Sequence, residues 1–366
     1  MDLIIGAGIS GLSYANFIEN DFFIVEKESE PGGYCKTIKR NGFVWDYSGH
    51  FFHFQHPELE KYICKNISAS SLLSVEKHTQ IYYKGKYIDF PFQKNIHQLE
   101  KEELIECLYD LFTAGKHSYS TFKEMVYLGK SIAEKFLIPY NEKLYACDLD
   151  VLDVNAMGRF FPKADKEDII LNFRSHDNSS YNHFFTYPRG GAIEYVYSLL
   201  KNIDQDKLSL NEVLQFVDVE RKVAITNRRE IKYDRLVSTL PFPQLLDICK
   251  LVYPDDVFSC NKVLVFNLGF DSKGNDKLNS WVYVPEKEFI FYRIGYYDNI
   301  MNTDRMSLYV EIGFSQKQEM LKEGLYLDRI LSDLRKMGII TTQKLVDYEA
   351  VLMNPAYVHI NKKSVE

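Results

Sequence analysis

The first 33 residues constrain this chain most, because they place a glycine-rich turn between two apolar runs. The run Leu3–Ile5 leads directly into Gly6–Gly11 (GAGISG), a helix-compatible segment continues to Glu19, and the second run, Phe22–Val25, ends at Glu26. This order predicts a strand, a turn, a helix, a second strand and an acid, which together start a dinucleotide-binding fold. A glycine turn alone is weak evidence, but here the flanking segments and the acid agree with it.

The glycines of the turn and the acid after it each have a role in such a site. Gly6 permits the tight turn, Gly8 lets the backbone approach a pyrophosphate, and Gly11 lets the helix lie close to the sheet. The amino terminus of the helix offers N–H groups and the positive end of its dipole to the phosphates. Glu26 stands where a carboxylate accepts from both ribose hydroxyls, which disfavours a 2′-phosphorylated nucleotide.

Two further glycine-containing segments follow, residues 31–33 (Pro-Gly-Gly) and the pair Gly49-His50. A glycine turn, an acid and a Gly-Gly pair in this order resemble the opening of FAD-binding flavoenzymes. The resemblance implies FAD as the cofactor, held in part by Gly32 and Gly33. Gly49 would let the backbone pass close to a flat ring, with His50 presenting a donor or acceptor there. The alternative for this second segment is a strand end with a packed histidine.

Composition narrows the class of protein. The 366 residues are 46% hydrophobic and 14% aromatic, which predicts two or three globular domains rather than a disordered chain. The formal net charge of −7 lacks the basic footprint of a nucleic-acid-binding protein. Six cysteines without a CxxC pair predict free thiols and no metal site. The early strand leaves no room for a signal peptide and no apolar run approaches about 18 residues, so we expect a soluble, cytoplasmic protein without a membrane span.

The pattern changes along the chain, which predicts an α/β protein with three domains. Residues 1–75 and 186–245 form a Rossmann-like FAD-binding domain in this prediction, because the apolar segment 236–240 resumes the first fold. Residues 97–185 carry apolar residues at helical spacing and predict an inserted helical domain. Residues 76–96 and 246–366 alternate as strands do and predict an antiparallel β-sheet domain that binds the substrate.

Short blocks along nearly the whole chain resemble UDP-galactopyranose mutases, especially those of the eukaryotic type. This family lies within the wider group of FAD-dependent amine oxidases and protoporphyrinogen oxidase-like flavoproteins. Each block is short, but the blocks occur in family order and are fairly specific as a set. They are residues 84–96 (KGKYIDFPFQKNI), 139–146 (PYNEKLYA), Arg159, 188–191 (PRGG), 236–239 (LVST), 281–285 (WVYVP) and 291–293 (FYR).

The resemblance implies a set of site residues. Arg159 and Arg293 stand where the family has the arginines that neutralise a pyrophosphate leaving group by charge-assisted bonds. His50, with the Gly49 carbonyl beside it, would lie against the flavin. The residues implied to hold the uracil and the ribose are Phe90, Gln93, Asn141, Tyr145, Trp281 and Tyr283. Two of these differ from the family pattern, since Phe90 replaces a tyrosine and Tyr145 a tryptophan.

The activity implied by the resemblance is a non-redox use of the flavin. In this family reduced FAD attacks the anomeric carbon of the sugar through N5 and displaces UDP. The sugar ring then opens and recloses as a furanose, and UDP returns. The chain is therefore expected to interconvert the pyranose and furanose forms of a UDP-sugar, for cell-surface polysaccharide synthesis. NAD(P)H is a candidate reductant for the flavin, and an oligomer is compatible with this expectation.

Other interpretations are open at this stage. A flavin oxidase or dehydrogenase of the amine oxidase or protoporphyrinogen oxidase type would need an apolar tunnel in place of a pyrophosphate clamp. The printed chain does not contain the family's closing GRxGxWxY segment, which supplies further flavin contacts, so a nucleotide-binding relative without activity is a third hypothesis. Arg159 could form a surface ion pair, and Arg293 could pair with Glu311 across the sheet. Gln93 and Asn141 could be caps beside prolines.

Overall fold

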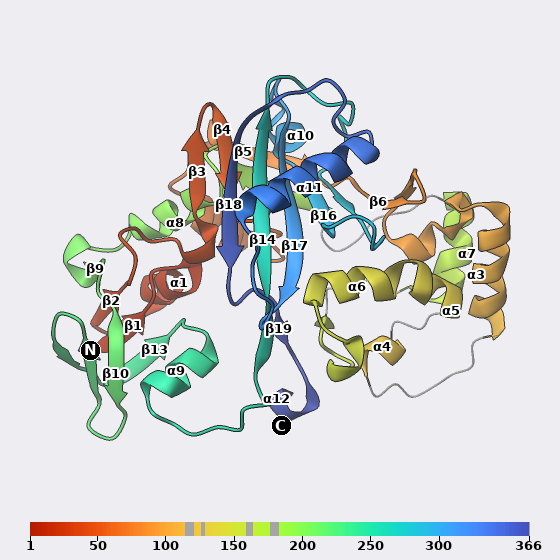
Figure 1. Cartoon of the computed structure of the whole chain (residues 1–366). Coiled ribbons are helices and arrows are strands. Elements are labelled where there is room, and N and C mark those ends of the chain that lie inside the picture. Colours follow the sequence, from red (N-terminus) through yellow and green to blue (C-terminus); the bar gives the residue numbers. More distant parts are fainter. Residues whose placement is uncertain (114–120, 126–128, 159–163, 176–182, 366) are drawn as a thin grey trace. The chain divides into compact units, whose positions relative to one another are not determined.

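The computed structural model describes residues 1–113, 121–125, 129–158, 164–175 and 183–365, which divide into two compact units (Figure 1). Unit 1 comprises Met1–Val75 and Phe185–Asp255, and unit 2 comprises Glu76–Phe184 and Asp256–Glu366. Both units combine helices and sheets, so the predicted α/β class is confirmed. Nearly all of the predicted helical segment, residues 97–185, and most of the predicted sheet segment, residues 76–96 and 246–366, belong to unit 2. The division of these segments into two separate domains stays a prediction.

A four-stranded parallel sheet forms the centre of unit 1 (Figure 1). Its strand order is β13-β1-β2-β9, and Leu3 of β1 lies opposite Leu236 of β13 and Phe23 of β2. All four residues of β1 are buried, as expected of a parallel strand that is covered on both faces. The strands are β1 (Asp2–Ile5), β2 (Phe22–Val25), β9 (Leu208–Ser209) and β13 (Arg235–Ser238).

Helices cover one face of this sheet, and a small sheet covers the other. Leu12 of α1 and Val196 of α8 pack with Ile4 in one buried cluster. Leu3 and Ile5, on the opposite face of β1, pack in a second cluster with the three-stranded antiparallel sheet β10-β11-β12. The elements of these layers are α1 (Ile9–Phe17), α2 (Pro57–Cys64), α8 (Ile193–Leu200), α9 (Phe242–Ile248), β10 (Leu214–Asp218), β11 (Val223–Thr226) and β12 (Glu230–Lys232).

Two pairs of antiparallel strands complete unit 1. Asn41-Gly42, a dipeptide typical of hairpin turns, joins β3 (Thr37–Arg40) to β4 (Phe43–Asp46). Both turn residues have positive φ, 53° and 80°, as a two-residue hairpin turn of this kind requires. The second pair, β5 (Leu72–Glu76) with β8 (Phe184–Pro188), lies where the chain passes between the units.

Unit 2 is built on an eight-stranded sheet, whose main path is β18-β14-β17-β16-β15-β6-β7, with β19 paired to β14 (Figure 1). Its pairs are antiparallel except one, because β6 runs parallel to β15 with Thr79 opposite Trp281. The prediction of a purely antiparallel sheet is therefore wrong at this pair. β6 is far from β15 in the sequence, and a strand that does not follow its neighbour through a short hairpin can pair with it in either direction. The strands are β6 (Thr79–Tyr83), β7 (Lys86–Asp89), β14 (Ser259–Phe270), β15 (Trp281–Tyr283), β16 (Arg293–Tyr296), β17 (Ser307–Ser315), β18 (Leu345–Met353) and β19 (Val358–His359).

The long helix α11 (Glu323–Lys336) crosses one face of this sheet (Figure 1). Its residues Tyr326, Ile330 and Leu334 pack in a core cluster with β14 and β17. Within the predicted sheet segment 246–366, the residue pattern predicts this helix at 325–337 and a strand over 289–297. The structure instead starts the short helix α10 (Tyr297–Met301) there, because the buried Asp298 carboxylate accepts from the Ser307 N–H and turns the chain.

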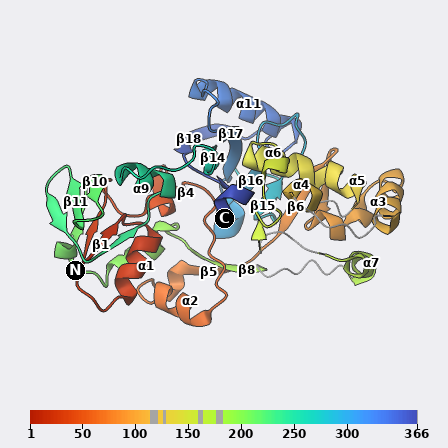
Figure 2. The same ribbon diagram turned by 90° about the horizontal axis from the view of Figure 1, so that it is seen from below.

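The remaining helices of unit 2 gather beside β6 and β15 (Figure 2). They are α3 (Lys101–Thr113), α4 (Phe122–Met125), α5 (Lys130–Ile132), α6 (Ile138–Tyr145) and α7 (Lys166–Ser175), with α12 (Lys362–Val365) near the end of the chain. A π-helical segment, Ala133–Leu137, joins α5 to α6. Pro139 lacks the N–H that would continue the regular α-helical ladder, which explains the wider turn just before it. Within the described residues, none of the helices combines the length and apolar character needed to span a bilayer.

Candidate functional site

The predicted cofactor site begins at the carboxyl end of β1, where side chains are excluded by the backbone geometry. Gly6 has φ +99°, a conformation that other residues adopt rarely. A Cβ on Gly11 would lie 2.0 Å from the Gly6 carbonyl oxygen, so α1 can approach the turn only with glycine there. Gly8 precedes α1, and no side chain caps this helix terminus. These positions fit the roles predicted for the three glycines.

The Gly-Gly pair packs directly against this turn. The Gly32 N–H donates to the Ala7 carbonyl at 2.9 Å, and Gly8 and Gly32 form an isolated parallel bridge. Gly32 and Gly33 both have positive φ, +135° and +54°, and a Cβ on Gly33 would lie 3.6 Å from the Gly8 Cα. Two turns without side chains therefore meet at the start of α1. Such a surface of backbone groups suits a phosphate chain, which approaches a helix terminus closely.

Glu26 lies at the carboxyl end of β2, beside the turn. Its carboxylate is buried and accepts from the Ala7 N–H at 2.8 Å and the Glu28 N–H at 2.9 Å. Each carboxylate oxygen has a second lone pair, so these bonds orient the group and leave acceptor capacity for ribose hydroxyls. The residues of unit 1 thus fit the adenosine and pyrophosphate of a dinucleotide.

Gly49 and His50 follow β4, and the structure shows a residue that the sequence interpretation missed. Asp46, the last residue of β4, is fully buried and accepts from the Thr37 hydroxyl at 2.5 Å, the Tyr187 hydroxyl at 2.8 Å and the Ala192 N–H at 3.0 Å. Burial raises the pKa of Asp46 to about 6, although these three donors oppose the shift. Asp46 thereby ties the hairpin to the turn before α8. Its position within the motif DYSGH was visible in sequence, but its partners were not.

His50 itself is half-buried in this loop. Its Nδ1 atom lies 3.0 Å from the Ser48 carbonyl, and its backbone N–H donates to the same oxygen at 2.7 Å. A carbonyl accepts hydrogen bonds, so Nδ1 carries a proton in this arrangement. The ring orientation is therefore set by a local contact.

In unit 2, Arg293 at the start of β16 forms the ion pair that the sequence allowed as an alternative. Its Nε and Nη2 groups donate to the two oxygens of Glu311 on β17 at 2.8 and 2.7 Å. Glu311 is 1% exposed and lies directly opposite Arg293 in the register of the two strands. This fork uses two of the five guanidinium N–H groups and the Tyr357 hydroxyl contacts the guanidinium too, so the arginine keeps up to two donors for a second anion.

Aromatic side chains surround this arginine. Tyr283 on β15 is its partner on the other neighbouring strand, and the Tyr283 ring lies 5.2 Å from that of Phe90 and 4.9 Å from that of Tyr140. The Tyr292 ring lies 6.1 Å from that of Tyr140. Phe90, Tyr283 and Arg293 are half-buried, whereas Tyr140 is buried beneath them. The structure therefore brings three of the predicted substrate residues to one partly exposed aromatic surface.

Only Phe90 and Tyr283 of the six residues predicted for the uracil and the ribose lie on this surface with Arg293, and the other four are buried. Asn141 and Tyr145 lie on α6 with 2% and 6% exposure, and the Asn141 amide donates to the Leu137 carbonyl at 2.6 Å. Gln93 is fully buried after β7, and Trp281 is buried on β15 opposite Thr79. In this structure the side chains of these four residues are buried, so they are not exposed for a ligand as predicted. Arg159 lies outside the described residues.

Sequence reasoning missed two residues near the end of the chain that hold α6. His359 on β19 lies with Nε2 2.9 Å from the Tyr145 carbonyl, and the Tyr357 ring lies 6.0 Å from the Tyr145 ring. Asn261 joins them, because it donates to the Leu144 carbonyl at 2.6 Å and accepts from the Tyr357 N–H at 2.7 Å. Burial lowers the pKa of His359, which favours the neutral form of the ring. No sequence signal singled these residues out.

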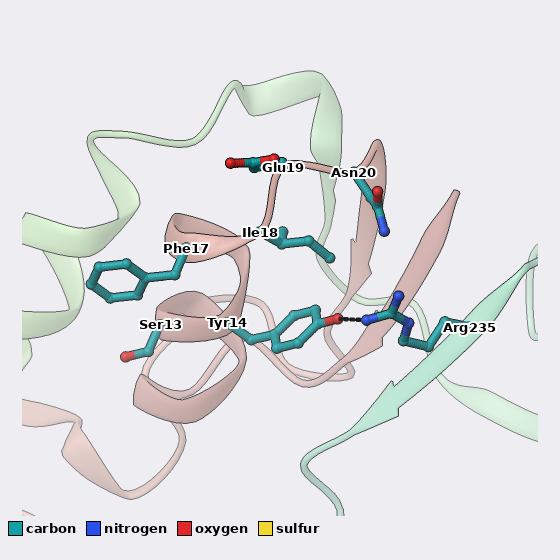
Figure 3. A pocket seen from close by; sticks show the side chains of 7 residues that line it. All are labelled: Ser13, Tyr14, Phe17, Ile18, Glu19, Asn20 and Arg235. Atoms are coloured by element: carbon teal, nitrogen blue, oxygen red, sulfur yellow. Dashed lines mark hydrogen bonds between the residues drawn. The ribbon is translucent and has the colours of Figure 1, made fainter.

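A cavity of about 670 Å³ in unit 1 lies away from the glycine turns (Figure 3). Tyr14 of α1 and Arg235, the first residue of β13, point toward one another there, with Nη1 of the arginine 3.2 Å from the phenol oxygen. The cavity is thus at the amino ends of the strands, whereas ligands of open α/β sheets bind at the carboxyl ends. It is not part of the predicted cofactor site. The described residues also contain no cluster of His, Cys, Asp and Glu that could hold a metal ion.

Comparison with known proteins agrees with this architecture. The sequence profile of the family described as flavin containing amine oxidoreductase matches residues 9–355, and the chain belongs to this family. Membership implies a flavin cofactor, and the glycine turns and Glu26 of unit 1 fit one.

Solved structures extend the likeness at low sequence identity. A reduced UDP-galactopyranose mutase is 23% identical with a TM-score of 0.89, over 99% of this chain and 84% of that one. A provisionally named protoporphyrinogen oxidase from Exiguobacterium sp. 255-15 is 15% identical with a TM-score of 0.76, over 98% and 87% of the two chains. A putrescine oxidase bound to putrescine is 14% identical with a TM-score of 0.66, over 96% and 84%. These likenesses concern the fold.

Proposed function

We propose that the chain is an FAD-dependent UDP-sugar mutase that interconverts pyranose and furanose forms of the sugar. The observation that carries this proposal is the position of Arg293 between aromatic rings on a half-buried surface of unit 2. A guanidinium beside flat rings matches a nucleotide diphosphate, which has a charged chain and a base that stacks. The fold likeness to a UDP-galactopyranose mutase supports the same substrate class.

In this proposal unit 1 holds FAD through its glycine turns and Glu26. The N–H groups at the start of α1 receive the pyrophosphate, and the Glu26 carboxylate accepts from the ribose hydroxyls. Gly49 and His50 belong to the flavin-facing loop. When bound in reduced form, the flavin supplies a nucleophilic nitrogen toward the anomeric carbon. NAD(P)H is the proposed reductant, and the proposed setting is cytoplasmic synthesis of cell-surface polysaccharide.

Arg293 is proposed to stabilise the diphosphate as it leaves the sugar. The leaving group gains negative charge, and a planar guanidinium follows that charge with paired N–H groups. Glu311 keeps the guanidinium oriented, because two bonds of 2.7–2.8 Å fix its plane. Phe90 and Tyr283 are proposed to hold the uracil and ribose, with Gln93, Asn141, Tyr145 and Trp281 supporting them. Arg159 is proposed as the second pyrophosphate arginine.

An FAD-dependent oxidoreductase is the second candidate, because the family description and two of the compared structures concern oxidation. The rings of Phe90, Tyr140 and Tyr283 offer it an apolar surface. For this enzyme Arg293 would serve only to pair with Glu311. Binding of UDP therefore separates the two candidates.

The test is to reconstitute the purified chain with FAD, follow the absorption band of the oxidised flavin, reduce it with dithionite and assay isomerisation of UDP-galactose. An Arg293→Lys chain keeps the charge but loses the planar fork, so we expect turnover to fall by roughly 100- to 1,000-fold. UDP binding should fall less. Hydrogen peroxide formation from amines by the parent, with no UDP binding, would favour the oxidoreductase and end the mutase proposal.

A further inference from the structure

Lys143 lies on α6 between Asn141 and Tyr145, and its ammonium group reaches a different part of unit 2. It donates to the carbonyl oxygens of Val284 at 2.8 Å, Glu286 at 3.0 Å and Phe291 at 2.5 Å. A protonated lysine has three N–H donors, and all three are used here. The three acceptors belong to residues 284–292, the segment that joins β15 to β16.

This segment has proposed substrate residues at both ends. Tyr283 precedes it as the last residue of β15, and Arg293 follows it as the first residue of β16. The three acceptors are distributed along the segment, two near Tyr283 and one near Arg293. One ammonium group therefore braces the connecting segment near both of its ends, next to the strand pair that places Tyr283 opposite Arg293.

The helix that carries Lys143 is itself fixed to the sheet. A Cβ on Gly313 of β17 would lie 2.2 Å from the Lys143 carbonyl oxygen, so helix and strand are in close contact there. Asn261 and His359 hold the next two carbonyls of α6, those of Leu144 and Tyr145. Lys143 thus links a rigid helix end to the segment between β15 and β16.

From this geometry we propose that Lys143 is a positioning residue, which places the Arg293 guanidinium and the Tyr283 ring for a nucleotide diphosphate. The inference rests on the proposed function and deepens it, since it assigns the arrangement of the substrate surface to a residue that need not touch substrate. Removing the ammonium group should loosen the segment without separating the strands, because the Val284 N–H still donates to the Tyr292 carbonyl at 2.8 Å and the middle of the segment has an anchor of its own. There the Asp333 carboxylate of α11 accepts from the Ile290 N–H at 2.9 Å, and Arg329 donates to the Glu288 carbonyl.

The same geometry makes positioning depend on pH. Burial lowers the pKa of Lys143 to about 7, while the nearby carboxylates Asp333 and Glu286 oppose the shift. A neutral amine has two N–H donors and cannot hold three carbonyls. Because the folded pKa lies below the ordinary 10.5, deprotonation stabilises the folded chain as pH rises from about 7 toward 10.5. The folded chain loses this proton within about one pH unit of 7, so substrate positioning should weaken there, while the gain in stability continues toward pH 10.5.

The experiment titrates UDP and uridine calorimetrically into the parent, Lys143→Met, Arg293→Ala and the double variant, with thermal unfolding of each. Lys262→Met is the matched control, since Lys262 is also buried in unit 2 and donates to one carbonyl, that of Gln318, at 2.6 Å. We expect Lys143→Met to raise the dissociation constant for UDP roughly 3- to 100-fold, the range for residues coupled through one hydrogen-bond network. Lys143→Met should change the dissociation constant for uridine less than that for UDP. It should also change the dissociation constant for UDP less when Arg293 is already replaced by Ala.

The pH arm repeats the UDP titration one unit below and one unit above the Lys143 pKa of about 7. The affinity of the parent relative to Lys143→Met should fall as pH rises, a change that a merely structural lysine would not produce. A folded Lys143→Met chain that binds UDP as tightly as the parent overturns the inference, and so does an equal loss in Lys262→Met. A parent that binds no UDP overturns the proposed function instead, and this inference with it.

Discussion

In unit 1 the candidate cofactor surface is made of backbone, whereas in unit 2 the candidate substrate surface is made of side chains. A Cβ on Gly6 would lie 2.2 Å from the Thr239 hydroxyl oxygen and one on Gly11 would lie 2.0 Å from the Gly6 oxygen, so neither position has room for a side chain and the ligand would meet N–H groups directly. Arg293 instead depends on Glu311, and Tyr283 on the rings packed behind it. The cofactor surface should therefore be disrupted by adding a side chain to a glycine. The substrate surface should be disrupted by removing a side chain that orients another.

The largest expected effect tests the dependence of Arg293 and Glu311 on one another. Arg293→Ala leaves the Glu311 carboxylate buried without its guanidinium, so the free energy of unfolding should fall by about 3–5 kcal/mol. Urea denaturation measures the change. The double variant Arg293→Met, Glu311→Met should recover most of that stability without recovering UDP binding. Recovery of UDP binding in the double variant would contradict the role proposed for the arginine.

The backbone surface is tested by one added methyl group. Gly11→Ala places a Cβ 2.0 Å from the Gly6 oxygen. We expect the free energy of unfolding to fall by about 1–3 kcal/mol or more, and the fraction of the chain that binds flavin to fall as well. The matched control is Gly324→Ala in the first turn of α11, where a Cβ meets nothing within 4 Å. That change should be neutral or stabilising. Full flavin occupancy in Gly11→Ala would show that the close approach is not required.

The aromatic half of the substrate surface should have an effect confined to binding. Tyr283→Ala removes a half-buried ring, and we expect UDP affinity to fall by about 1–3 kcal/mol, as for base stacking on aromatic side chains. Tyr283 is a cleaner probe than Tyr145, whose ring is 6% exposed and packs against Tyr357. Tyr109→Ala on α3, where the ring is 69% exposed, serves as the control. Calorimetric titration with UDP should separate the two variants, and equal affinities would count against the aromatic surface.

The smallest expected effect concerns Asp46, the buried side chain at the end of β4, just before the loop with Gly49 and His50. Its folded pKa of about 6 lies above the ordinary 3.8, so the folded state binds the proton more tightly than the unfolded state. Its contribution to stability is therefore full below pH 3.8 and falls as pH rises toward about 6. The free energy of unfolding is measured by urea denaturation at a series of pH values for the parent and for Asp46→Asn. The difference between the two should decline up to about pH 6 and stay constant at higher pH. A difference that does not vary with pH would contradict the shift.

The glycine turn shows how much of a site can be predicted from the sequence. The local steric demands are the positive φ values of Gly6, Gly32 and Gly33 and the contact that a Cβ on Gly11 would make with the Gly6 oxygen. The spacing to Glu26 follows from one helix and one strand. The strands, the helix and the hairpin at Asn41-Gly42 were therefore predictable, as were the family resemblance and the α/β class.

The surface of unit 2 needed the tertiary structure, because its contacts join residues that are far apart in the chain. The register of β16 on β17 decides that Arg293 meets Glu311, and the parallel entry of β6 beside β15 decides what lies next to Trp281. Lys143 contacts the segment 284–292 because α6 packs against β17, a contact between residues far apart in the chain. The sequence by itself determined the glycine turns, since their constraints are local and steric. Only the tertiary structure decided which side chains orient the arginine, since strand register and helix docking are long-range choices.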